Sequence, residues 1–330
     1  MAAFDSQDLQ PLARVSQRAQ PPAVTNTKSL MFKNAVVYRL THEFTLDAET
    51  LHNALVKQSF TPCSGIRPSS FGWIPPIGGE DAPLVHEVSG YFLICARKEE
   101  KVVPPSALNE AVTERVERIE ATEGRKLPRT DKLALKDDSL AELLPRALAR
   151  SKQILGYIAP GEGIALVATS KFSEAEQFVN CIRDSLGSFP VVLPQVQRNP
   201  SELFTHWLNY RKLPENFSLG DQCDLLDPET SATVTCRRQD LATQEIVSHI
   251  NAGKVCTRLG LRWHGDLAIA VDKDLSLRQI KFENPGTHED EDVIAQLDAA
   301  FVQMALEFKR FLPALYSALG GEHIPEFTES

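Results

Sequence analysis

The chain lacks the features that mark membrane, secreted and zinc-binding proteins. It has no apolar run of about 20 residues, the length that crosses a bilayer, and its N-terminus has no apolar stretch of the signal-peptide type. Its six cysteines are scattered singly without a C-x-x-C pair, so we expect reduced thiols that are buried as small apolar side chains. Together these absences predict a cytoplasmic protein.

Loops that cradle nucleotides or carry a catalytic nucleophile are missing as well. The sequence contains no G-x-G-x-x-G, no G-x-x-x-x-G-K-[ST] and no G-x-S-x-G motif. Its eight histidines are solitary, and none has the spacing of a zinc-ligand pair. The acidic cluster 289–292 could bind a divalent ion, but the start of a helix explains it more simply. We therefore expect no catalytic residue, no cofactor, no metal and no enzyme, with a nuclease that uses this cluster as the enzymatic alternative.

Concentrated positive charge is scarce, and the one segment that has it is informative. The 330 residues carry a formal net charge of -9, yet five cations stand against the single acid Asp131 between positions 125 and 136: Arg125, Lys126, Arg129, Lys132 and Lys136. Such a run is usually a solvated helix face. It also has a local field that attracts a polyanion even when the whole molecule repels one. The residues alone leave both interpretations open.

The pattern along the chain predicts an α+β fold, built on antiparallel sheets with flanking helices and a projecting two-helix arm. A chain of 330 residues is expected to form two or three subdomains. We expect a flexible tail at 1–30, an N-terminal α+β region at 31–105, a two-helix arm with a basic elbow at 106–158, a β-α-β region at 159–210 that packs with 31–105, and a C-terminal α+β region at 211–330.

Individual elements follow from hydrophobic periodicity, caps and turn residues. Strands are predicted at 35–40, 84–88, 91–97, 164–168, 190–193, 233–237, 254–263, 267–271 and 275–282. Helices are predicted after Asp47, from Ser106 to the basic segment, at 140–158, 173–186, 243–251 and 291–319, and after Asn199. The proline- and glycine-rich stretch 60–79 is predicted to be a packed loop.

Further cations flank the basic elbow. Arg97, Lys98 and Lys101 leave the second hairpin strand, while Arg115 and Arg118 lie on the helix that enters the arm. We expect glutamates of that helix to pair with these two arginines at helical spacing, which leaves the positive charge of the elbow free. The elbow has no aromatic residue for stacking on bases, and no recognition helix is evident. The cations therefore predict contacts with the phosphates of double-stranded DNA, independent of sequence.

Several segments, in order along most of the chain, resemble the bacterial family of the recombination-associated protein RdgC. The resembling residues are Met31–Asn34, Val37–Leu40, Phe60–Cys63, Gly72–Pro76, Ile94–Lys101, Leu143–Ala147, Ser185–Val192, Gln239–Leu241 and His249–Val255. They match from residue 31 to about residue 321, so the resemblance is more specific than any single motif.

The resemblance implies horseshoe-shaped subunits that pair into a homodimeric ring around duplex DNA. It also implies association with the nucleoid, no sequence specificity, and restraint of RecA-driven strand exchange; binding to single strands is left open. One subunit contact is implied at Leu148, on the helix predicted after 143–147, where another member has a large aromatic side chain. A second contact is implied at Arg238, Gln239 and Asp240. The alternative for this basic group is that it is simply the end of a strand that leads into a helix cap.

The charge pattern and the resemblance together lead to two hypotheses. The first is a non-enzymatic, ring-forming protein that binds DNA and modulates RecA-dependent recombination. The second is a protein-interaction module that regulates recombination by contacting an acidic protein partner instead of DNA.

Overall fold

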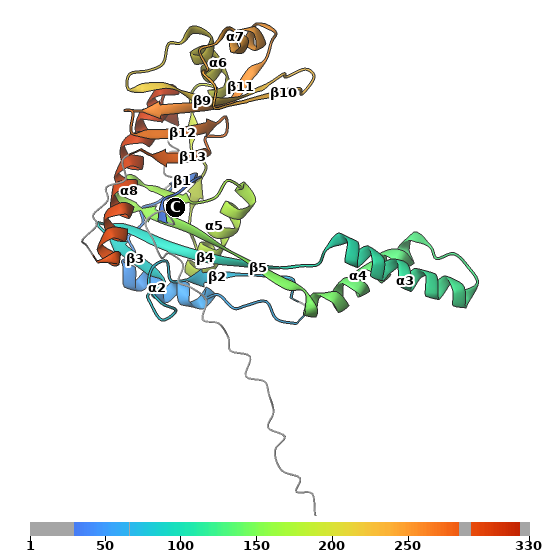
Figure 1. The fold of residues 1–330 in the computed structure, drawn as a ribbon. Coiled ribbons are helices and arrows are strands. Elements are labelled where there is room, and N and C mark those ends of the chain that lie inside the picture. Colours follow the sequence, from blue (N-terminus) through green and yellow to red (C-terminus); the bar gives the residue numbers. More distant parts are fainter. Residues whose placement is uncertain (1–29, 66, 284–291, 324–330) are drawn as a thin grey trace, which may run out of the picture.

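Two antiparallel sheets organise the chain, in a computed structural model that describes residues 30–65, 67–283 and 292–323 (Figure 1). The first sheet has seven strands in the order β2-β4-β5-β6-β1-β7, with β3 paired to β4. Its strands are β1 (Val36–Leu40), β2 (Ser69–Ile74), β3 (Val85–Val88), β4 (Tyr91–Val102), β5 (Leu148–Ala159), β6 (Ile164–Val167) and β7 (Val191–Val192). The α+β class with antiparallel sheets is thereby confirmed.

The second sheet has five strands in the order β10-β9-β11-β12-β13. These are β9 (Phe217–Leu226), β10 (Thr233–Arg237), β11 (Val255–Trp263), β12 (Leu267–Asp272) and β13 (Leu277–Phe282), and the small pair β8 (Gln195–Val196) and β14 (Glu322–His323) lies apart from both sheets. Ala35 exchanges two backbone hydrogen bonds with Leu277, at 2.8 and 2.9 Å, so the residues just before β1 join the first sheet to the second.

Helices cover these sheets in layers. They are α2 (Ala48–Leu55), α3 (Pro105–Glu123), α4 (Arg129–Leu143), α5 (Phe172–Leu186), α6 (Pro200–Tyr210), α7 (Gln244–Asn251) and α8 (Val293–Ala318), with single 3-10 turns at Val56–Gln58, Leu144–Arg146 and Pro160–Glu162. Local sequence sets several ends. Asp47 accepts a hydrogen bond from the Thr50 N–H at the start of α2, Asn199 caps α6, and Gly187 ends α5 with a φ of 82°.

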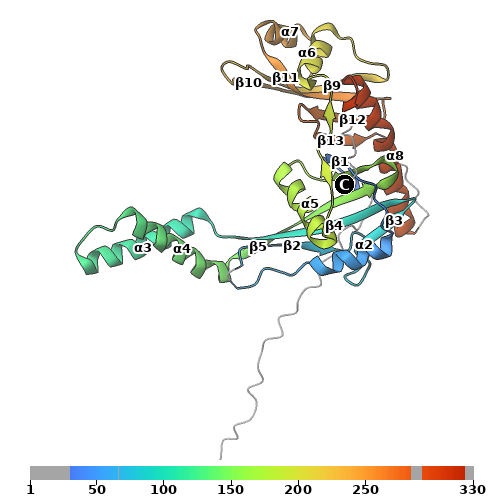
Figure 2. The same cartoon turned by 180° about the vertical axis from the view of Figure 1, so that it is seen from behind.

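Helix α8 holds the two sheets together. Its buried residues Phe301, Met304 and Phe308 share one hydrophobic core with Tyr157 of the first sheet and Ile269 of the second. Figure 2 shows the helix running past both sheets, while α2 and α5 cover the other face of the first sheet over a separate core. None of the described helices is both long enough and apolar enough to cross a membrane.

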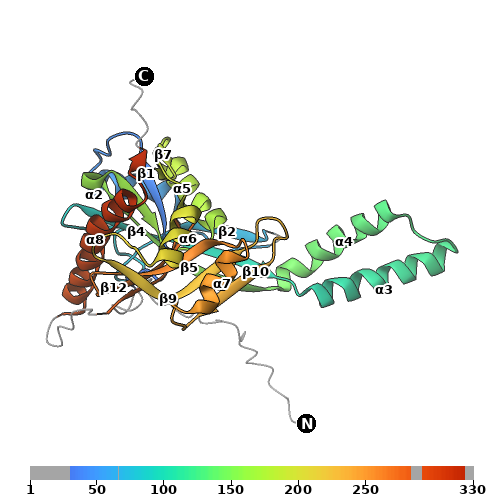
Figure 3. The same ribbon diagram turned by 90° about the horizontal axis from the view of Figure 1, so that it is seen from above.

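The arm projects from the first sheet as an antiparallel pair of helices, α3 and α4 (Figure 3). In Figure 1 it leaves one end of the molecule, and β10 points the same way from the other end, which gives the subunit a horseshoe outline. Helix α3 has no fully buried residue, and in α4 only Ser139 is fully buried. The arm therefore has no core of its own and depends on its root in the sheet for its position.

Two expected elements are wrong, and one strand has no counterpart among the expected elements. The helix predicted at 140–158 ends at Leu143, and residues 148–159 form strand β5. Pro145 interrupts the helical pattern, and the Ile-, Leu- and Tyr-rich end of this segment is buried between neighbouring strands. The packed loop predicted at 60–79 contains strand β2, and strand β9 was not predicted at all.

Other expectations fall at the edge of the described residues. Of the tail predicted at 1–30 only Leu30 is described, and it is buried. The acidic cluster 289–292 lies outside the described residues except Asp292, which precedes α8 without a side-chain cap.

We predict that Phe308→Ala lowers the free energy of unfolding by about 3–5 kcal/mol, because the cavity forms where α8 seals the shared core. Urea denaturation followed by circular dichroism measures this change. The control is Leu306→Ala on the same helix, where the native side chain is 45% exposed and the change should stay within about 0.5 kcal/mol. Equal losses for the two variants would contradict the role assigned to α8.

Candidate nucleic-acid interface

Strands β4 and β5 form the stalk on which the arm stands. They are paired along their whole length, from Phe92 opposite Ile158 to Val102 opposite Leu148. Their inner halves are buried, whereas the outer halves are polar and mostly exposed. The same ladder therefore begins in the core and ends as a two-stranded ribbon at the root of the arm.

One face of the stalk brings two lysines directly opposite each other. Lys98 on β4 faces Lys152 on β5, an arrangement that is unfavourable for like charges. Each has its own carboxylate: Lys98 Nζ lies 2.6 Å from Glu100 Oε1, and Lys152 Nζ lies 2.6 Å from Glu174 Oε2. Burial alone would raise the pKa of Glu174, but hydrogen bonds from Lys152 and Thr169 lower it. The pair is thus held in place on strands and not on mobile loops.

The other face of the stalk is anchored to the loop before β2. Arg97 lies over the ring of Phe60, 5.2 Å from its centroid, and Lys101 Nζ donates to the Gly65 carbonyl at 2.7 Å. Between them Glu99 is buried and accepts from the Cys63 N–H at 2.7 Å. Arg97, Lys98 and Lys101 therefore belong to one structural unit, as the sequence suggested, but they are divided between its two faces.

Contacts between α3 and α4 fix the geometry of the arm. Arg115 on α3 forms an ion pair with Glu142 on α4 and donates to Ser139 Oγ at 3.3 Å. At the far end, Gly124 closes α3 with a φ of 65°, and Pro128 precedes α4. Arg115 and Lys132 look like DNA contacts in the sequence, but both also have structural roles. Arg115 joins α3 to α4 through Glu142, and Lys132 of α4 pairs with Glu120 of α3.

Glu120 organises the tip. Its carboxylate accepts from the Leu127 N–H at 2.9 Å and pairs with Lys126 at 3.0 Å and Lys132 at 3.2 Å. The backbone hydrogen bond from Leu127, followed by the one from Lys126, lowers the pKa of this carboxyl to about 2. The tip is therefore a folded turn with an ionised glutamate at its centre.

The expected elbow of free positive charge is wrong in two respects. Residues 129–136 lie within α4 and not in the turn. Glu120 compensates Lys126 and Lys132, and Glu123 pairs with Arg125 at 2.8 Å, so most of the cluster has acid partners. The expected pairing of α3 glutamates with Arg115 and Arg118 does not include these contacts of Glu120, because helical spacing cannot show that the chain folds back at Gly124.

A basic stripe remains on α4. Arg129, Lys132 and Lys136 follow at intervals of three and four, so they share one face of the helix. The side chains of Arg129, Lys136 and Arg118 of α3 form no hydrogen bond or ion pair within the part of the chain that the structure describes. An acidic edge on α3 contrasts with this stripe, at the exposed residues Glu110, Glu114 and Glu117. The arm is thus close to neutral overall but has separated charge.

The two candidate subunit contacts lie far apart. Leu148 is the first residue of β5, not of a helix as expected; it is 84% exposed and stands opposite Val102, which is also exposed. Arg238, Gln239 and Asp240 form the turn between β10 and α7, where the Gln239 side chain donates to Glu245 Oε2 at 3.0 Å and Asp240 accepts from the Ala242 N–H at 2.8 Å. One contact is at the root of the arm and the other is at the opposite end of the horseshoe (Figure 1).

Comparisons with known proteins show the family of the chain. A family model described as "Putative exonuclease, RdgC" matches residues 30–322. The chain belongs to the RdgC family. The recombination-associated protein RdgC of Pseudomonas aeruginosa PAO1 is 40% identical over 304 residues, which cover 90% of this chain and 99% of that protein. The protein of the same name from Aeromonas hydrophila is 39% identical over 300 residues, 89% of this chain and 99% of the relative.

Membership in the RdgC family indicates a recombination-associated role. The curated relatives carry that name, whereas the family description refers to an exonuclease. Among the described residues no group of three or more His, Cys, Asp or Glu side chains is placed to hold a metal ion. The thiols are free, and all but Cys63 are buried.

Sequence reasoning missed Arg150 and Lys152 as part of the RdgC stalk. Both fall within the helix predicted at 140–158, although they alternate with Ala149 and Ser151 and precede a buried run, which is the period of a strand. That alternation was the available signal.

We predict that Glu120→Gln increases amide hydrogen exchange at Leu127 roughly fivefold at neutral pH, because the carboxylate loses its charge-assisted bonds. Since the folded pKa lies below the ordinary value of 4.5, the stabilisation is complete above that value and disappears as the pH falls toward 2. Wild type and variant should therefore converge in acid. Glu117→Gln, on the exposed edge of α3, is the control, and an equal effect there would contradict the role of Glu120.

Proposed function

We propose that this RdgC protein binds double-stranded DNA without sequence preference, as a homodimeric ring. The observation that supports this most is the stripe Arg129, Lys132 and Lys136, which a paired β-ribbon holds away from the body of an acidic protein. Lysine and arginine on rigid elements suit phosphate contacts, which carry affinity but no sequence information.

The horseshoe outline suits closure by a second copy. Leu148 at one end is a large apolar side chain with 84% exposure, and residues 238–240 form a polar turn at the other end. If each meets its counterpart in a two-fold dimer, both contacts are isologous and the assembly closes without leaving a free end. Two arms then lie within one ring.

Separated charge resolves the conflict between a net charge of -9 and a polyanionic ligand. The acidic edge of α3 and the acids of the body can face outward, while the stripe on α4 faces the DNA. In this arrangement the ring occupies duplex DNA in the nucleoid and limits access of RecA to it, which accounts for the recombination-associated role without a catalytic site.

We predict that the triple variant Arg118→Glu, Arg129→Glu, Lys136→Glu weakens duplex binding at least about tenfold at moderate salt, because it removes three cations that neutralise phosphates. The slope of log affinity against log salt concentration should also become shallower, by about 0.9 for each phosphate contact that is lost. These three side chains have no partner within the described residues, so the fold should survive. Fluorescence anisotropy over a salt series measures both quantities.

The matched control reverses three exposed lysines elsewhere, Lys57, Lys212 and Lys273, and changes the net charge equally. Equal losses for both triple variants would show that only net charge matters. If neither variant lost affinity, the arm would not contact DNA, and a nuclease-resistant complex with a protein partner would then support the protein-interaction alternative.

We predict that Leu148→Glu raises the dissociation constant of the dimer at least about tenfold, because it places charge at the centre of the proposed apolar contact. Sedimentation equilibrium measures this constant, with Leu306→Glu on the outer face of α8 as the control. Unchanged dimerisation would place the subunit contact elsewhere.

A further inference from the structure

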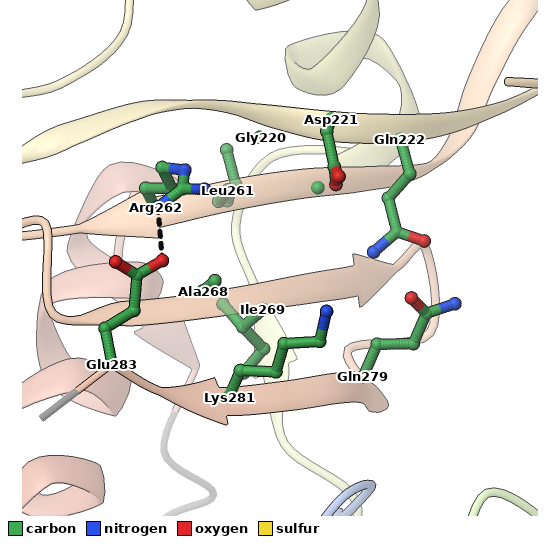
Figure 4. A pocket seen from close by; sticks show the side chains of 11 residues that line it. Gly220, Asp221, Gln222, Leu261, Arg262, Ala268, Ile269, Gln279, Lys281 and Glu283 are labelled. Carbon is green, nitrogen blue, oxygen red and sulfur yellow. Dashed lines mark hydrogen bonds and ion pairs between the residues drawn. The ribbon is translucent and has the colours of Figure 1, made fainter. Parts of the chain in front are cut away.

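The second sheet has a depression of about 80 Å³, lined by glycines, irregular strand pairs and polar side chains without partners among the described residues. Alternate side chains of β9, β11 and β12, such as Leu261 and Ile269, point into the core shared with α8. The depression lies on the opposite face of the sheet. The close-up in Figure 4 looks onto this face, with the strands in front of the helix. Gly220 on β9 and Gly260 on β11 are among the residues that line the depression.

These two glycines lie in strand interiors, where glycine weakens a strand and often marks a bulge or the close approach of a ligand or of another backbone. A Cβ atom on Gly260 would lie 2.8 Å from Gln222 Cγ, and one on Gly220 would lie 2.9 Å from the carbonyl carbon of Gly260. The Gln222 side chain and backbone therefore cover Gly260, and the backbone of β11 covers Gly220, so a Cβ atom at either position would force the two strands apart. The two glycines thus allow the close approach of β9 and β11 beside the depression.

Both neighbouring ladders are irregular at the depression. The pairing of β9 with β11 shifts between Leu259 and Leu261, and the pairing of β12 with β13 shifts between Ala268 and Ala270. Gln279 sits at the second irregularity with a φ of 49°, a left-handed conformation that is uncommon for glutamine. Bulges that re-aim side chains and residues in rare conformations gather at binding sites.

Three side chains with hydrogen-bond donors line the depression without a partner among the described residues. Lys281 on β13 has no ion pair there, and the amides of Gln222 and Gln279 form no side-chain hydrogen bond. Figure 4 shows the Lys281 ammonium and the Gln222 amide pointing over the centre of the hollow. Arg262 at the edge is already paired with Glu283 at 2.5 Å.

We infer that the depression binds one phosphate group. The uncommitted Lys281 ammonium and the amide N–H groups beside it favour an anionic acceptor, and the volume suits a single tetrahedral anion. Asp221 also lines the hollow, and its carboxylate limits the affinity for an anion there. The group can come from the DNA backbone, which would deepen the proposed function, or from free phosphate, which would not depend on it.

Titration calorimetry with inorganic phosphate and anisotropy with a short duplex distinguish these sources. Lys281→Gln should abolish phosphate binding, and Asp221→Asn should strengthen it several-fold; a general loss of structure cannot produce opposite changes. Lys273→Gln, in the exposed turn between β12 and β13, is the control. A duplex source predicts in addition that Lys281→Gln lowers the salt slope by about 0.9 per bound copy.

The outcomes separate the two proposals. If Lys281→Gln changes neither phosphate binding nor the DNA salt slope, the phosphate site is wrong while duplex binding can stand. Suppose that Lys281→Gln abolishes phosphate binding and Asp221→Asn strengthens it, but the wild-type protein does not bind duplex DNA. The site then stands with free phosphate as its ligand, and the proposed function is wrong.

Discussion

The pairing of β4 with β5 is the constraint on which the rest of the molecule depends. Each strand is buried where the helices pack and polar where it leaves them, so one hydrogen-bonded ladder connects the core to the root of the arm. The arm has no core, and a two-helix hairpin of this kind is marginal in isolation. Its orientation, and with it the position of every candidate DNA contact beyond Val102, derives from this ladder.

Charge in the arm is arranged by folding more than by composition. Glu120 accepts a hydrogen bond from the Leu127 amide and pairs with Lys126 and Lys132. Arg115 of α3 forms an ion pair with Glu142 of α4 and so connects the two helices. These ion pairs are largely exposed, so each adds little to global stability but restricts local geometry. Arg129 and Lys136, unpaired among the described residues, lie on one face of α4 together with Lys132, so a segment that looks uniformly basic becomes a stripe with a structured tip.

Sequence patterns predicted much of the fold where local signals and tertiary packing agree. Asp47, Asn199 and Gly187 begin or end helices as expected, because capping depends on the nearest few residues. The strand 148–159 was mistaken for a helix, since a leucine- and alanine-rich stretch satisfies both patterns until its neighbours are known. The depression on the second sheet gave no sequence signal, because Gly220, Gly260 and Lys281 are distant in the chain.

By itself the sequence determined the α+β class, the positions of most helices and strands, and the family with its recombination-associated role. These follow from short-range periodicity, caps and the ordered match along most of the chain. The tertiary structure alone decided which cations are paired, which share a face and which stand opposite one another. Those relations depend on contacts between residues far apart in sequence, such as Lys98 with Lys152 and Arg115 with Glu142, and no local pattern encodes them.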